Sequence, residues 1–121
     1  MPSYIVRHIR DVEPVPCPCG SSIRPITKAD TPVANLHVTH IQDSRKHYHK
    51  NATEYYYILE GGGKMELDGD TIDLEPGQVI YIPPGVAHRG YGDFRAVIFG
   101  VPAMEHTDEF FVEDRVKGRP E

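Results

Sequence analysis

Three histidines and one glutamate stand at spacings that can bring metal-binding side chains together. His47 and His49 occupy positions i and i+2, so on an extended strand their imidazoles share one face, about 7 Å apart along the chain. Glu54 follows five residues after His49, and His88 lies in a distant segment. Imidazole and carboxylate groups are ordinary ligands of divalent transition metals. The four side chains can therefore surround one ion if the fold converges on it.

The elements around these residues must turn for that convergence to happen. On an unbroken strand Glu54 would point away from His49, because the interval between them is odd. Residues 50–53 are polar and include Asn51, which favours a turn. Such a turn would return Glu54 to the same site from the next strand. His88 follows the turn at residues 83–85 and is expected to begin a separate strand.

In the rest of the chain, turn-forming residues recur at the short intervals that are typical of a protein with many strands. Glycine and proline, 11 of each, recur between stretches rich in Val, Ile, Tyr and Phe, which favours short strands over helices. We expect Gly61-Gly62-Gly63 to end one strand and Asp68-Gly69 to form a hairpin turn. The pattern indicates a sandwich or barrel. The expected strands cover residues 36–41, 55–59, 64–67, 70–74, 78–82 and 94–99.

Both ends of the chain are less regular. Residues 11–32 are proline-rich and predict an irregular loop or an edge segment. The stretch 107–111 predicts the start of a short helix with Thr107 as its N-cap. The last residues, 116–121, are expected to be frayed.

The spacing of the chemistry-bearing residues resembles the two conserved motifs of the cupin superfamily. The first block reads His-x-His, four residues, Glu, six residues, Gly, and the second reads Gly, five residues, Pro, one residue, Gly, two residues, His. The 15 residues 62–76 between them resemble the short inter-motif segment of small microbial cupins. The residues that carry the resemblance are His47, His49, Glu54 and Gly61 in the first block and Gly77, Pro83, Gly85 and His88 in the second.

The resemblance implies an all-β fold, an antiparallel jelly-roll barrel of six to eight strands. It implies one cupin domain over residues 1–121, with the motif-bearing barrel at about 33–101. It also implies that one divalent metal ion is bound by four ligands, and Fe, Mn, Ni, Co, Cu and Zn all suit this donor set. The implied ligands are His47, His49, Glu54 and His88.

Two positions depart from the usual motifs. Ile41 stands where a glycine usually precedes the first histidine by six residues, and Gly92 stands where an asparagine usually follows the last histidine by four. Neither is a ligand, so the metal prediction is unaffected, but both departures argue against transferring the activity of one particular subfamily.

Three classes of function stay open. Six-coordination would leave two positions free, and one glutamate against a divalent ion leaves a local charge that favours an anionic or enolisable oxygen ligand. We rank a dioxygenase-type oxidoreductase first. The alternatives are a redox-neutral sugar or sugar-phosphate isomerase, epimerase or decarboxylase, and a non-catalytic metabolite-binding cupin, because fold alone does not decide function.

Two further side chains invite a role. Tyr56 lies two residues from Glu54, so its phenol is expected to point into the barrel, where it would donate a hydrogen bond to a bound oxyanion or take part in proton transfer. It is our catalytic candidate, and packing as a strand aromatic, like Tyr55 and Tyr57, is the alternative. Arg95 lies on an apolar strand and is expected to pair with a neighbouring acid rather than with substrate.

The other histidines, His8, His37, His40 and His106, are expected to be structural and hydrogen-bonded. Arg24 is expected only to be exposed. A bridge between Cys17 and Cys19 would be strained, so two reduced thiols in a tight loop are expected, with a redox or substrate-contact role left open.

Composition excludes several partners. The net charge of -5 argues against nucleic acid and against anionic lipid. No apolar run approaches the ~20 residues of a membrane span, and the N-terminal residues do not resemble a signal peptide, so a cytoplasmic protein with a small-molecule substrate is expected. Small barrels leave apolar outer strands that need cover, which predicts a homodimer.

Overall fold

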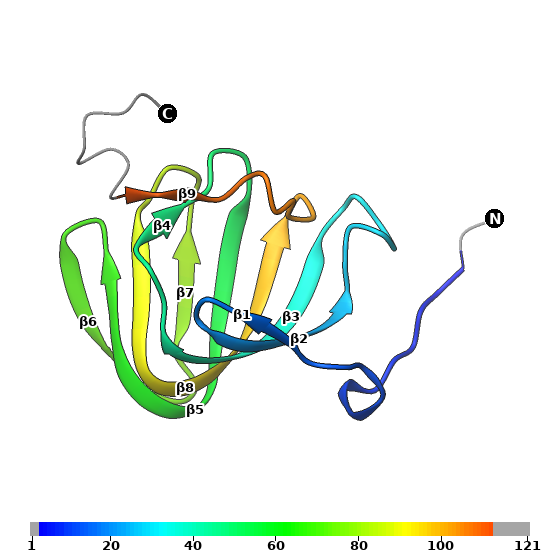
Figure 1. The fold of residues 1–121 in the computed structure, drawn as a ribbon, viewed down its shortest axis with the longest axis horizontal. Coiled ribbons are helices and arrows are strands. Elements are labelled where there is room, and N and C mark those ends of the chain that lie inside the picture. The colour runs from blue at the N-terminus through cyan, green and yellow to red at the C-terminus, as the bar shows by residue number, and fades with distance from the viewer. Residues whose placement is uncertain (1–2, 113–121) are drawn as a thin grey trace.

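The computed structural model describes residues 3–112, which form one 3-10 helix and nine β-strands (Figure 1). Within these residues no helix has the length and apolar character needed to cross a bilayer. The elements are η1 (Ile9–Asp11), β1 (Val15–Cys17), β2 (Gly20–Ile26), β3 (Asn35–Asp43), β4 (His47–Tyr48), β5 (Thr53–Leu67), β6 (Asp70–Leu74), β7 (Val79–Ile82), β8 (His88–Val101) and β9 (Phe110–Phe111).

Every strand pairing is antiparallel, and the sheet curls on itself around β8 (Figure 1). The strand order is β1-β2-β3-β8-β4-β9, and β5 pairs with β6, β7 and β8. The predicted all-β antiparallel barrel is confirmed. The described residues contain nine strands instead of six to eight, because β4 and β9 add two strands of two residues each.

The predicted end of a strand at the three glycines is wrong. The 15-residue strand β5 runs through them, with a register shift against β8 between Ile58 and Glu60. Gly61 adopts a φ of 85°, and a side chain there would collide with the carbonyl oxygen of Asp93. The glycines therefore let the strand bend closely over β8 instead of stopping it.

Alternation along the strands builds the core. Ile58 and Met65 on β5, Ile82 on β7, and Phe94 and Ala96 on β8 are all at most 1% exposed. Burial of a large apolar side chain contributes roughly 1.5–3 kcal/mol, so these residues fix the inner face of the barrel. The predicted hairpin at residues 68–69 is confirmed, because β5 and β6 pair on either side of it.

The proline-rich N-terminal segment contributes an edge. β1 and β2 form a hairpin, and β1 is the outermost strand beside β2. The expectation of two reduced thiols is wrong, since Cys17 and Cys19 form a disulfide. The turn of the hairpin brings their Cα atoms to 5.2 Å, a separation that is ordinary for a bridged pair.

The predicted helix at residues 107–111 is also wrong. Phe110 and Phe111 form β9, which pairs with Tyr48 and His47 of β4. The Tyr48 and Phe110 rings stack with centroids 5.5 Å apart, so tertiary pairing overrides the local helix signal. The prediction for residues 116–121 lies outside the described residues.

The outer face of β5, β7 and β8 is apolar. Register pairs place Tyr55 beside both Tyr81 and Phe99, and Tyr57 beside Val79. A contiguous apolar patch of this kind marks an interaction surface. Its members are between 40% and 67% exposed: Tyr55, Tyr57, Leu59, Val79, Tyr81, Phe99 and Val101.

We expect two copies of the chain to cover this patch mutually as a homodimer. Val79→Glu and Tyr81→Glu each place a charge on the patch, and both should shift the protein to a monomer in light scattering at micromolar concentration. Thr71→Glu, on exposed β6 away from the patch, should leave the mass unchanged. A monomeric wild-type protein would refute the dimer.

Candidate metal centre

Three strands, and one residue directly after the first of them, bring the predicted metal ligands to one point. His47 in β4 is the register partner of His88, the first residue of β8. His49 follows β4, and Glu54 is the second residue of β5. The predicted turn between His49 and Glu54 is present, so the glutamate returns to the face of the histidines.

A carboxylate from the far end of the chain holds that turn. The backbone amides of Lys50, Asn51 and Ala52 all donate to the side chain of Asp108, at 2.8, 3.1 and 3.0 Å respectively. Three amides on one carboxylate fix the loop much as a helix cap fixes a first turn. The turn therefore depends on a residue 56 or more positions away.

The four side chains form one compact donor group. Each of His47, His49, Glu54 and His88 offers one donor atom, and these atoms all lie within 4.8 Å of one another. Ligands on opposite sides of an ion with bonds of about 2.1 Å would stand about 4.2 Å apart. The spacing therefore suits a single ion at the centre of the group.

Backbone carbonyl groups fix how each imidazole is turned. Nδ1 of His47 donates to the Arg45 carbonyl at 2.7 Å, Nδ1 of His49 to the Asp108 carbonyl at 2.6 Å, and Nδ1 of His88 to the Val86 carbonyl at 3.0 Å. Each bond sets the tautomer and leaves Nε2 as the free donor atom, as is usual for metal-bound histidine.

Three of the donor atoms are buried and lack hydrogen bonds. Nε2 of His49 and Nε2 of His88 lie 3.1 and 2.9 Å from Oε1 of Glu54, but none of these atoms has a hydrogen bond of good geometry. Buried polar groups are almost always satisfied. A divalent cation would satisfy all three, so the group fits a metal ion.

The electrostatics of the group favour opposite charges side by side. Burial works against the protonated form of His49, but the Glu54 carboxylate outweighs it and raises the pKa of His49 to about 9. Burial also opposes the charged form of Glu54, but His49 and His88 hold the pKa of that carboxyl well below its usual range. For His47, burial and the nearby His88 lower the pKa to about 4.

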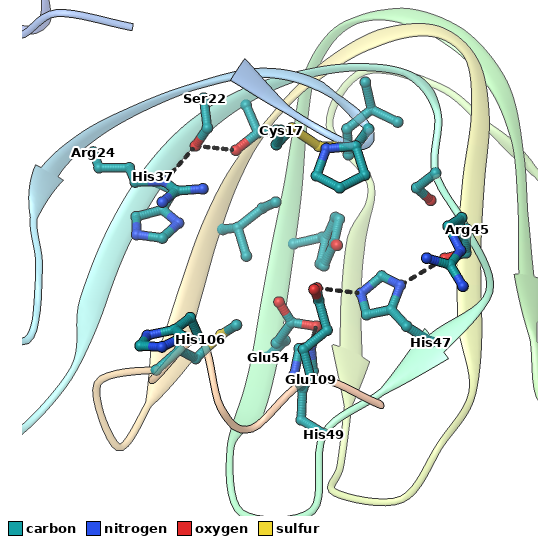
Figure 2. Close-up of a pocket in the computed structure, with 18 of the residues that line it drawn as sticks. Cys17, Ser22, Arg24, His37, Arg45, His47, His49, Glu54, His106 and Glu109 are labelled. Carbon is teal, nitrogen blue, oxygen red and sulfur yellow. Dashed lines mark hydrogen bonds and ion pairs between the residues drawn. A yellow bond between two sulfur atoms is a disulfide. The ribbon is translucent and has the colours of Figure 1, made fainter. Parts of the chain in front are cut away.

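The donor group borders a cavity of about 220 Å³ inside the barrel (Figure 2). Tyr56 is 5% exposed and lines this cavity, with its ring centroid 6.4 Å from that of His88. Its predicted orientation into the barrel is confirmed. Its hydroxyl makes no hydrogen bond to another described residue, and burial followed by the nearby Glu54 raises the pKa of the phenol well above its ordinary value.

Several cavity-lining residues were not predicted from the sequence. His37 and His106, expected to be structural, both line the cavity, and so do Arg24 and Glu109. For His37 a signal existed, because it alternates with Thr39 and Ile41 on β3 and all three face inward. The cavity is lined by Cys17, Pro18, Cys19, Ser22, Arg24, His37, Thr39, Ile41, Ser44, Arg45, His47, His49, Glu54, Tyr56, Ile98, Met104, Glu105, His106, Glu109 and Phe111.

The remaining predicted residues lie outside the centre. Arg95 pairs with Glu60, 3.6 Å from Nε to Oε1, so the expected ion pair is confirmed. His40 pairs with Asp93 at 2.5 Å, and Nδ1 of His8 accepts a hydrogen bond from the Arg10 amide at 3.1 Å. These two histidines are structural, as expected.

Several proteins of known sequence are similar to part of this chain. An uncharacterized protein of Methanocaldococcus jannaschii is 35% identical over 71 residues, which are 55% of this chain and 57% of that protein. Glucose-6-phosphate isomerase of Thermococcus gammatolerans is 43% identical over 53 residues, 38% of this chain and 28% of that enzyme. Quercetin 2,3-dioxygenase of Bacillus subtilis is 43% identical over 42 residues, 35% and 12% respectively. The chain thus matches little more than half the length of the first of these relatives.

Solved structures share this fold. A protein from Planctomyces limnophilus superposes with a TM-score of 0.81 at 31% identity, over 92% of this chain and 97% of its own. A nucleoside dehydratase from Streptomyces superposes with a TM-score of 0.80 at 15% identity, over 90% and 91% of the two chains. The family model described as "Cupin domain" matches residues 37–99. With its curled antiparallel sheet and its His-His-Glu-His group, this chain belongs to the cupin family.

Proposed function

We propose that this protein is a metal-dependent enzyme that acts on a small anionic or enolisable metabolite, with dioxygenase-type oxidation as its reaction. The observation that carries the proposal is the donor group of three oriented imidazoles and one buried carboxylate, which borders a cavity in the barrel. His47, His49, Glu54 and His88 would hold the ion. Similarity to a quercetin dioxygenase over 42 residues supports the reaction class.

A bound divalent ion supplies Lewis-acid polarisation of a carbonyl or enolate oxygen. The cavity suits this chemistry in two ways. Part of its wall is apolar, which limits water around a reactive substrate, and this part consists of Ile41, Ile98, Met104 and Phe111. The un-ionised phenol of Tyr56 faces the same space and would donate a hydrogen bond to a substrate oxyanion.

A redox-neutral isomerase is the second candidate. It is favoured by the similarity to a glucose-6-phosphate isomerase over 53 residues. In such a reaction the same donor group would hold a metal ion that supplies Lewis-acid polarisation of the sugar carbonyl, and Tyr56 or Glu109 in the cavity would move the proton. Binding of a metabolite without turnover is the outcome that would exclude both reactions.

The ligand assignment predicts loss of metal on substitution of one histidine. His49→Ala should abolish tight metal retention, because the ion loses a buried ligand, while the barrel stays folded by circular dichroism. His40→Ala, which changes a histidine outside the centre, serves as the matched control in elemental analysis. Undiminished metal in a folded His49→Ala protein would contradict the assignment.

Proton release should accompany metal binding. His49 is protonated in the metal-free protein at neutral pH, since its pKa is about 9, and only the neutral ring binds a metal. Calorimetric titrations of the protein with metal, in two buffers of different protonation enthalpy, should therefore show that a proton is displaced from the His49–Glu54 pair at neutral pH. Fewer protons should be released above pH 9. Proton release that is the same at neutral pH and above pH 9 would contradict the raised pKa of His49.

The same shift has a consequence for stability. The pKa of His49 rises from 6.5 to about 9 on folding. The stabilisation of the metal-free protein by the His49–Glu54 pair is therefore complete below pH 6.5 and is lost as the pH rises through about 9.

Oxygen uptake separates the two candidate reactions. The metal-loaded protein should consume oxygen with small enols, diketones or aromatic acids, and Tyr56→Phe should lower the rate about 10²–10⁴-fold with metal content unchanged. Tyr57→Phe, on the outer face, is the control. Isomerisation of sugar phosphates without oxygen uptake would replace the first candidate with the second.

A further inference from the structure

One wall of the cavity carries a cationic side chain that the metal centre does not use. Ser22 and Arg24 on β2 and His37 and Thr39 on β3 all line the cavity. Figure 2 shows the Arg24 guanidinium beside the His37 imidazole, on the wall away from His47. Arg24 is exposed, so this pair stands where the cavity opens to solvent.

The charge of Arg24 is not neutralised within the described part of the chain. Arg7, Arg89 and Arg95 each form an ion pair with a carboxylate. Arg24 has no carboxylate within ion-pair distance among residues 3–112, and its one polar contact is a long bond of 3.4 Å from Nε to the Ser22 hydroxyl. Both terminal amino groups of the guanidinium are therefore available to a ligand.

The hydroxyl beneath Arg24 is itself held in place. The Ser22 and Thr39 hydroxyls share a hydrogen bond of 3.0 Å across the β2–β3 pair, and both residues are buried. The guanidinium thus contacts a hydroxyl that is itself fixed. This contact limits the conformational freedom of the Arg24 side chain, which would otherwise be lost when an anion binds.

His37 adds a hydrogen-bond donor next to this cation. Its ring makes no hydrogen bond to any residue in the described range. Burial, followed by the charge of Arg24, lowers the pKa of His37 to about 4, while Glu54 acts in the opposite direction. The imidazole is therefore neutral at physiological pH, and its pKa is affected by the charges of both the Arg24 guanidinium and Glu54.

The acidic residues that line the cavity have partners other than Arg24. Glu105 pairs with Lys28, Glu109 lies 3.8 Å from His47, and Glu54 belongs to the donor group. The uncompensated positive charge on the β2–β3 wall is then that of Arg24. A guanidinium with two free amino groups matches the paired oxygens of a carboxylate or phosphate.

We propose that Arg24 and His37 form an anion-binding subsite that takes the carboxylate or phosphate of the substrate, whose other end lies at the four-residue donor group. This subsite rests on the proposed function only for the position of that second end. A cavity of about 220 Å³ is smaller than the roughly 300–1,000 Å³ of drug-sized sites. The substrate class is therefore a small metabolite with one terminal anionic group and a metal-binding oxygen at the opposite end.

Titration with inorganic phosphate and with acetate, followed by NMR of the His37 ring, tests the subsite. Either anion should shift the His37 resonances saturably in the wild-type protein, and the one that binds more tightly identifies the source of the charge. Arg24→Gln should weaken binding about ten- to a hundredfold, because it removes a charge-assisted contact. Arg24→Lys, which keeps the charge and loses the fork, should weaken it less. Arg95→Gln, on the outer face, is the matched control.

The His49→Ala variant separates this subsite from the metal centre. Anion binding that survives in His49→Ala and still depends on Arg24 supports the subsite even if the protein binds no metal. Anion binding that disappears with His49→Ala places the anion on the metal and overturns the subsite. Absence of saturable shifts in wild type, or equal affinity in Arg24→Gln with an unchanged melting temperature, overturns it as well.

Discussion

Burial of the Glu54 carboxylate is the constraint on which the rest of the structure depends. An isolated charge inside an apolar barrel would cost several kcal/mol, and this residue is only 3% exposed. Its stabilisation comes from the imidazoles of His49, directly after β4, and of His88, at the start of β8. The pairing of β4 with β8, which joins His47 to His88, must therefore be kept in register. The bend of β5, which the glycines permit, is compatible with that register because β5 follows β8 over its full length.

The orientation of the centre comes from main-chain atoms. All three imidazoles are held by backbone carbonyls of the loops that precede or cross them, at Arg45, Val86 and Asp108. Such contacts require the path of the loop and not a particular side chain. The Asp108 carboxylate is the exception, since its side chain holds the loop that contains Asn51 while its carbonyl holds His49.

Much of this could be predicted from local pattern, and the misses have a common cause. The strands expected at 70–74 and 78–82 agree closely with β6 and β7, and the odd interval before Glu54 predicted a turn. The helix predicted at residues 107–111 failed because β9 pairs with β4, far away in the sequence. Arg24 was overlooked for a related reason: its role depends on what β3 places opposite it, which a single sequence does not state.

The segment matched by the family model, residues 37–99, contains every member of the donor group, whereas Arg24, His106 and Glu109 in the cavity wall lie outside it. The part of the chain that would activate a substrate and much of the part that would choose it are thus encoded in separate stretches. Flanking segments can diverge and change which molecule fits while the reactive centre stays intact. Family membership then indicates the reactivity of the centre much more than the substrate specificity. Two proteins with identical centres can act on unrelated metabolites.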